Sequence, residues 1–179
     1  YPGSADPFNQ EGPNFATGIS FPGPGQGNSG FIPPDTMGGV SPTQIFIPVN
    51  GWFAIYNKSG VQSFAASANT FFASVRNASN VSDPRVWFDK ISQRWFICAI
   101  NVTTPNRVLL AVSSSATLTN NTSFSYFQFN QNVVAPAGDA SALFDYPLMG
   151  VDANGIYIGG NMFAGSYTGS AVFVVNKAS

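Results

Sequence analysis

Three aspartates stand at matching places in the chain, each just before a short apolar segment with the composition of a β-strand. They are Asp35, Asp83 and Asp145. If the three strands open neighbouring sheets, the carboxylates gather around one opening and could hold a cation or a polar ligand. The alternative is local, because an Asp beside a Pro commonly caps a turn by accepting backbone N–H groups. We favour capping and keep the three residues as ligand candidates.

The chain contains few residues that could act in catalysis. The chain has 179 residues with eight acidic side chains and no His. The absence of His excludes a Ser-His-Asp relay and a His-based zinc site within these residues. Paired carboxylates that cleave a glycosidic bond remain as the one familiar catalytic chemistry. We therefore assign no catalytic residue and favour a non-enzyme.

The segment Asp152-Ala153-Asn154-Gly155 resembles the start of a calcium-binding loop. A calcium loop needs a later acidic ligand, and this one has none. Asn-Gly between two apolar segments is instead a strong hairpin signal. We predict a turn here and assign no metal ligand, so calcium is the only cofactor that the pattern leaves open.

Low charge limits the partners. Charged residues make up 8% of the chain and the net charge is −1, so no basic cluster exists to follow a nucleic-acid backbone. No apolar run approaches the roughly 18 residues of a membrane span. We expect neither nucleic acid nor a membrane span.

Six Asn-X-Ser/Thr triplets match the pattern for N-glycosylation. The alternative is a surface rich in Asn, Ser and Thr that matches by chance. We take the triplets as glycosylation candidates and, since the chain starts at Tyr1 without a signal peptide, we expect a processed, secreted or cell-surface protein. The candidates are Asn57, Asn77, Asn80, Asn101, Asn120 and Asn121.

The single cysteine and the tryptophans are expected in the core. Cys98 lies inside the apolar run Phe96 to Ile100, which lacks the electropositive neighbours of a reactive thiolate. The alternation around Trp52, Trp87 and Trp95 favours packing between sheets over exposed platforms for sugar rings.

Short strand candidates fill the chain from residue 35 onward, and only residues 67–75 suggest a helix, of one or two turns. Residues 1–34 are rich in Gly and Pro and are predicted to form an extended arm on the surface. The rest is all-β.

A plan of strand, polar turn and aromatic strand recurs three times, at 33–49, 83–100 and 144–160. The leading aspartates are 48 and 62 residues apart, close to the length of one β-propeller blade. We predict about three four-stranded blades, at 35–80, 81–135 and 143–179. A β-sandwich or jelly roll is the alternative, because the same short strands suit it.

The strings PPDTMGG, NGWFAIYNKSG and SDPRVWFDKISQRWF occur in this order. They resemble a group of secreted, multi-bladed β-propeller proteins with loosely sialidase-like or integrin-like blades, in which PPDT opens the first blade. The resemblance covers 33–179. It implies a partial ring here, since propellers need about four to eight blades to close.

We therefore expect an extracellular, non-catalytic structural or adhesive propeller module that belongs to a cell-surface or filament assembly. Its partners would be the remaining blades of the same chain or other protein subunits, with carbohydrate as a further candidate. The alternative is a glycan-cleaving hydrolase or lyase with its site at the propeller axis, formed by the three aspartates.

Overall fold

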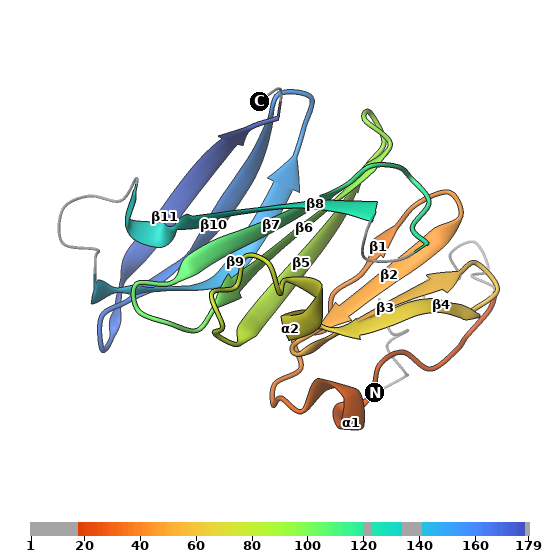
Figure 1. Ribbon diagram of the computed structural model, residues 1–179, viewed down its shortest axis with the longest axis horizontal. Helices are drawn as coiled ribbons and strands as arrows, with labels where there is room; N and C mark the ends of the chain where they lie inside the picture. The colour runs from red at the N-terminus through yellow and green to blue at the C-terminus, as the bar shows by residue number, and fades with distance from the viewer. Residues whose placement is uncertain (1–17, 120–122, 134–140, 178–179) are drawn as a thin grey trace, which may run out of the picture.

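A computed structural model describes residues 18–119, 123–133 and 141–177, and these residues form an all-β fold with three antiparallel sheets (Figure 1). The predicted all-β class is confirmed. Sheet 1 contains β1 (Gly39–Val40), β2 (Gln44–Val49), β3 (Trp52–Asn57) and β4 (Gln62–Ser67). Sheet 2 contains β5 (Val81–Asp89), β6 (Arg94–Asn101), β7 (Arg107–Ser113) and β8 (Phe124–Asn130). Sheet 3 contains β9 (Leu143–Val151), β10 (Gly155–Phe163) and β11 (Tyr167–Asn176).

Among the described residues, the helical elements are short turns. They are α1 (Gln26–Ser29), α2 (Ala68–Phe71) and the 3-10 turn η2 (Gln131–Val133). The side chain of Ser67 caps α2 by accepting a hydrogen bond from Thr70 N at 3.0 Å. The helical candidate at 67–75 is thus a single turn at the start of the connection from sheet 1 to sheet 2.

Every strand pairs with its neighbour in sequence, so each sheet is a meander. The first hairpin of each sheet is closed in the same way, by a side-chain oxygen that accepts a backbone N–H three residues later. Ser41 Oγ accepts from Gln44 N at 3.0 Å, Asp89 Oδ2 from Ser92 N at 2.9 Å, and Asp152 Oδ1 from Gly155 N at 2.8 Å. The repeat seen in the sequence is therefore a repeat of local turn chemistry as well.

Strand β6 is buried on both faces, because sheet 2 lies between the other two sheets. Trp95, Ile97 and Ala99 join the core between sheets 1 and 2, where they meet residues such as Phe46. The alternate residues Phe96, Cys98 and Ile100 join the core between sheets 2 and 3. This explains why β6 is an almost unbroken apolar run, a pattern typical of strands covered on both sides.

Cys98 is fully buried in the second of these cores. Burial raises the pKa of its thiol to about 12, against the smaller, opposing effect of the Arg85 charge. The thiol is therefore protonated and inert at neutral pH, which agrees with the expected packing role.

The N-terminal arm, as far as the structure describes it, covers the outer face of sheet 1. The ring of Phe21 lies 4.9 Å from the ring of Tyr56. Ser29 Oγ donates to Asn50 O at 2.7 Å, and Gly51 has a φ of +81° with the carbonyl oxygen of Ser29 so close that a Cβ would clash. Residues 18–34 contain no strand, so this part of the arm is held by side chains and turns instead of by pairing with a sheet edge.

The tryptophans differ in burial. Trp95 is fully buried, contacts Phe46 and Phe88, and donates Nε1–H to Ala116 O at 2.9 Å. Trp52 is half-buried, and Trp87 is 44% exposed. The expectation that all three pack between sheets is wrong for Trp87, because alternation along a strand does not reveal which face is covered.

We expect Trp95→Ala to lower the free energy of unfolding by about 3–5 kcal/mol, since it opens a cavity in the first core and leaves the Ala116 carbonyl unpaired. Chemical denaturation followed by circular dichroism measures this change. Trp87→Ala is the matched control and should cost less than about 1 kcal/mol. Equal losses for the two variants would contradict the packing described here.

Candidate functional site

The three predicted aspartates come together near the start of the first strand of each sheet. Asp35 precedes β1, Asp83 lies in β5 and Asp145 lies in β9, and β5 is in contact with both β1 and β9. The side chains of Asp83 and Asp145 are hydrogen-bonded to each other, and the charge of Asp35 acts on Asp145. We refer to Asp35, Asp83 and Asp145 as the carboxylate cluster.

Asn50 links sheet 1 to sheet 2 at the cluster. Its Nδ2 donates to Asp35 Oδ2 at 2.8 Å, while its Oδ1 accepts from the backbone N–H of Asp83 at 2.7 Å. Its own N–H donates to Pro34 O at 2.7 Å. The sequence offered one signal for this residue, the Asn-Gly pair of the β2–β3 turn, but nothing that identified its partners.

Asp83 links sheet 2 to sheet 3. It is only 7% exposed, and both of its carboxylate oxygens are engaged. Oδ1 accepts from Ser82 Oγ at 3.0 Å, and Oδ2 accepts from the backbone N–H of Tyr146, in sheet 3, at 3.1 Å. Asp83 thus accepts a backbone N–H, but the donor lies in another sheet, so this bond is not the local turn cap that we expected.

Backbone strain accompanies these contacts. Asp35, Asp83 and Tyr146 have positive φ angles of 43°, 53° and 50°. Such angles are unfavourable for residues other than Gly and persist where surrounding contacts hold them. Here the hydrogen bonds made by Asn50 and Asp83 keep the backbone in this conformation.

Burial, together with the neighbouring carboxylates of the cluster, raises the pKa of Asp145. The largest cause is burial, followed by the hydrogen bond and the negative charge of Asp83, with a smaller effect from Asp35. Two neighbouring carboxylates cannot both ionise at low cost, so Asp145 holds its proton more tightly than an isolated Asp does.

Arg85 lies two residues after Asp83 and is buried. Its guanidinium carbon is 4.3 Å from the centroid of the Tyr146 ring, and Nη1 donates to Pro84 O at 2.9 Å. Nε and Nη2 have no hydrogen-bond partner among the described residues. The cation–π contact adds a third connection between β5 and β9.

A second asparagine links two sheets in the same way as Asn50. Asn106, in the β6–β7 connection of sheet 2, donates through Nδ2 to Phe144 O at 2.7 Å and accepts from Phe144 N at 2.9 Å. Phe144 directly precedes Asp145. A side-chain amide therefore fixes the start of β9 against sheet 2, as Asn50 fixes β5 against sheet 1.

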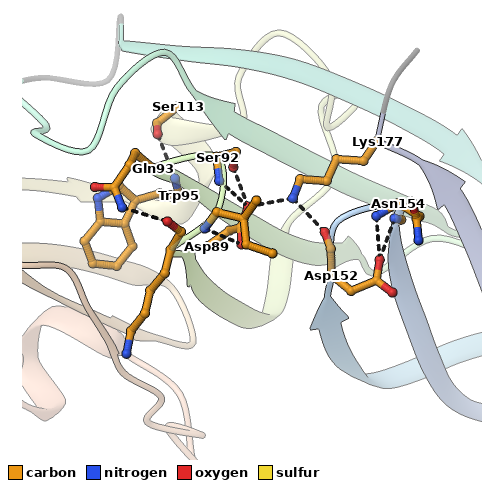
Figure 2. A network of polar contacts seen from close by, with 11 residues as sticks. Asp89, Ser92, Gln93, Trp95, Ser113, Asp152, Asn154 and Lys177 are labelled. Atoms are coloured by element: carbon orange, nitrogen blue, oxygen red, sulfur yellow. Dashed lines mark hydrogen bonds and ion pairs between the residues drawn. The ribbon is translucent and has the colours of Figure 1, made fainter.

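At the opposite end of β5, Lys177 forms a buried ion pair with Asp89 (Figure 2). Lys177 Nζ lies 2.6 Å from Asp89 Oδ2 and 2.6 Å from Asp152 O, so it joins the first hairpins of sheets 2 and 3. Burial alone would raise the pKa of Asp89, but the hydrogen bonds from Lys177, Ser92 and Ile91 together hold it well below its usual range. Asp89 therefore stays ionised, and the stability that it contributes is present above about pH 4 and is lost as the pH falls below that value.

The described residues contain no group of three or more His, Cys, Asp or Glu with the geometry to hold a metal ion. Asp152, the first residue of the calcium-like segment, uses Oδ1 to accept from Asn154 N and Gly155 N at 2.7 and 2.8 Å. The segment is thus the hairpin between β9 and β10. Asp152 therefore acts through hydrogen bonds from the backbone of its own turn.

The glycosylation candidates fall into three groups. Asn57, Asn77 and Asn80 are exposed. Asn101 is fully buried, and its Nδ2 donates to Arg76 O at 3.1 Å, which leaves no room for a glycan on that nitrogen and removes it from the candidates. Asn120 and Asn121 lie outside the described residues.

Comparison with known proteins gave no match to a family model, a curated protein or a solved structure. Within the described ranges, none of the helices has the length and apolar character of a membrane span.

We expect Asp145→Asn to stabilise the protein at pH 7. A raised pKa in the folded state means that stability falls as the pH rises from about 4 through that pKa, and Asn removes this loss while keeping an N–H donor for Asp83. Thermal unfolding at pH 4 and pH 7 tests the sign, because the gain should disappear at pH 4. Asp152→Asn is the control and should give no gain at pH 7, since hydrogen bonds from Gly155 and Asn154 lower the pKa of Asp152. A loss of stability in Asp145→Asn at both pH values would contradict repulsion within the cluster.

Proposed function

We propose that this chain is a non-catalytic structural or adhesive module, built from consecutive blades of a β-propeller and displayed outside the cell. The observation that carries the proposal is the outer face of sheet 3, which is apolar and uncovered by the described residues. Its partners would be further blades or other protein subunits that stack on this face.

Two rows without charged side chains cross the three strands on the outer face of sheet 3. The first row is Leu148, Gly159 and Val172, and the second is Gly150, Tyr157 and Val174. Leu148, Val172 and Val174 are 60%, 68% and 67% exposed. An apolar sheet face of this kind marks a surface for protein contact, because exposing it to water is unfavourable.

The other sheet faces support this interpretation by contrast. Both faces of sheet 2 lie in apolar cores, and the outer face of sheet 1 is in contact with the arm through Phe21. We refer to the two rows on the outer face of sheet 3 as the docking face, the surface that a further sheet would cover.

Stacking in series favours a propeller over a β-sandwich. In a two-sheet sandwich each sheet buries one face, whereas here sheet 2 is covered on both faces and the first strands β1, β5 and β9 adjoin. Successive blades that face a common axis have this arrangement. The assignment to blades at 35–80, 81–135 and 143–179 stays part of the proposal.

The alternative, a glycan-cleaving hydrolase or lyase, would place its acid and base in the carboxylate cluster. The contacts of the carboxylate cluster favour a structural role instead. Asp83 is buried with both oxygens engaged, and Asp35 accepts from Asn50. A glycosidase needs two carboxylates that reach a sugar between them, with room for water or a covalent intermediate.

A docking face should cause the isolated chain to associate. We expect the wild-type chain to bind a hydrophobic dye and to form dimers or larger species at micromolar concentration. Leu148→Asp combined with Val172→Asp should weaken this association at least about tenfold, since each charge must be desolvated on contact. Sedimentation velocity over a concentration series measures the change.

Val61→Asp is the matched control, because Val61 is equally exposed but lies in the β3–β4 turn, away from sheet 3. It should leave association unchanged. A wild-type chain that stays monomeric and binds no dye would refute the docking face.

An extracellular location makes a separate prediction. When the chain is secreted from eukaryotic cells, we expect glycans on the exposed residues Asn57, Asn77 and Asn80, and none on buried Asn101. Peptide mapping by mass spectrometry, before and after enzymatic deglycosylation, reads the occupancy of each site. Unmodified Asn at all three exposed positions would count against a secreted glycoprotein.

A further inference from the structure

Two arginines meet where the connection from α2 to β5 passes the start of β7. Arg76 lies in that connection, and Arg107 is the first residue of β7. Both guanidinium groups are held by carbonyl groups of one short loop. Arg76 Nη1 donates to Ser79 O at 2.7 Å, and Arg107 Nη1 donates to Val75 O at 3.4 Å. Two like charges are therefore fixed near each other.

Asn101 holds the backbone of both arginines. Its Nδ2 donates to Arg76 O at 3.1 Å, and its Oδ1 accepts from Arg107 N at 2.7 Å. Asn101 is fully buried, so this link is shielded from water. The turn after Arg76 is closed by Ser79 N, which donates to Arg76 O at 3.2 Å. It includes Ala78 at a φ of 58°, an unfavourable angle that these hydrogen bonds maintain.

The described residues do not neutralise these two charges. Their one ion pair joins Lys177 to Asp89, and neither Arg76 nor Arg107 pairs with a carboxylate. Both arginines are half-buried, and Arg76 Nε is buried without a hydrogen-bond partner. Like charges that are partly shielded from water repel each other, and an unpaired buried N–H adds a further cost. A bound anion would remove the repulsion.

We propose that Arg76 and Arg107 bind a doubly charged tetrahedral oxyanion, a sulfate or phosphate group. Its two negative charges balance the two guanidinium charges, whereas a single carboxylate would leave one of them unbalanced. Guanidinium groups donate strong, charge-assisted hydrogen bonds to such oxygens. Each guanidinium has several N–H groups, and the contacts with the loop use only one on each side chain.

The group that binds is either a free ion or an ester on a larger molecule, such as a sulfated polysaccharide. Asn77 and Ala78, next to Arg76 in the loop, are exposed, so the loop is open to water on this side. The site shares no residue with the docking face or the carboxylate cluster. It therefore stands independently of the proposed function.

The test titrates the whole chain with sodium sulfate and, separately, with sodium phosphate by isothermal titration calorimetry at pH 7. Sodium chloride keeps the ionic strength constant, so that general screening does not change. We expect saturable binding of sulfate or phosphate at a single site, and none of acetate. Arg107→Lys should weaken binding at least about tenfold, since Lys keeps the charge but lacks the planar set of donors.

Arg76→Gln removes one of the two charges and should also weaken binding at least about tenfold. Circular dichroism and the melting temperature check that both variants fold. If Arg76→Gln does not fold, because the bond to Ser79 O is lost, Arg107→Lys decides the test alone.

Arg94→Gln is the matched control. Arg94 is exposed and begins β6, which is antiparallel to β7, so it lies at the opposite end of sheet 2 from Arg107. This variant loses the same charge and should keep the wild-type affinity. The proposal is overturned if neither sulfate nor phosphate binds saturably, or if Arg107→Lys binds as tightly as the wild type. An equal loss in Arg94→Gln would also overturn it, because binding would then follow net charge alone.

A competition experiment distinguishes the two sources of the anion. Dextran sulfate is added to the chain, and the titration with sodium sulfate is repeated, with unmodified dextran as the control. Loss of sulfate binding only with dextran sulfate supports a site that accepts an ester on a polysaccharide. Unchanged sulfate binding supports a site for the free ion.

Discussion

Burial of β6 on both faces is the constraint on which the rest of this structure depends. On one face of β6, Trp95, Ile97 and Ala99 are buried against sheet 1. On the other face, Phe96, Cys98 and Ile100 are buried against sheet 3. Each large apolar side chain so buried contributes roughly 1.5–3 kcal/mol, and a chain with 8% charged residues has few other sources of stability. Sheets 1 and 3 therefore pack on opposite faces of this strand.

Polar contacts then decide how the sheets align. Apolar packing is not directional, but a side-chain amide that bonds a backbone N–H or C=O in the next sheet has one geometry. Asn50 and Asn106 act in this way, and Lys177 adds an ion pair at the other end of β5. The carboxylate cluster belongs to the same set of contacts, and it tolerates its crowded charge because Asp83 and Asp145 bond to each other.

Local patterns in the sequence were good predictors. The all-β class, the turn at Asp152 and the burial of Cys98 follow from composition and spacing, because each depends on residues a few positions apart. Asn50 and Asn106 could not be found in this way, since their partners lie 33 and 38 residues further along the chain. The exposure of Trp87 was missed for a related reason, because its surroundings are set by the placement of another sheet.

The meander order of the strands bears on how the chain acquires its structure. Every strand bonds to the one made just before or just after it, so no sheet has to wait for a distant segment to arrive. Contacts between residues near in sequence form at small entropic cost and favour fast folding. A ribosome that has released residues as far as the end of β4 has already delivered the whole of sheet 1, and synthesis can extend the stack one layer at a time.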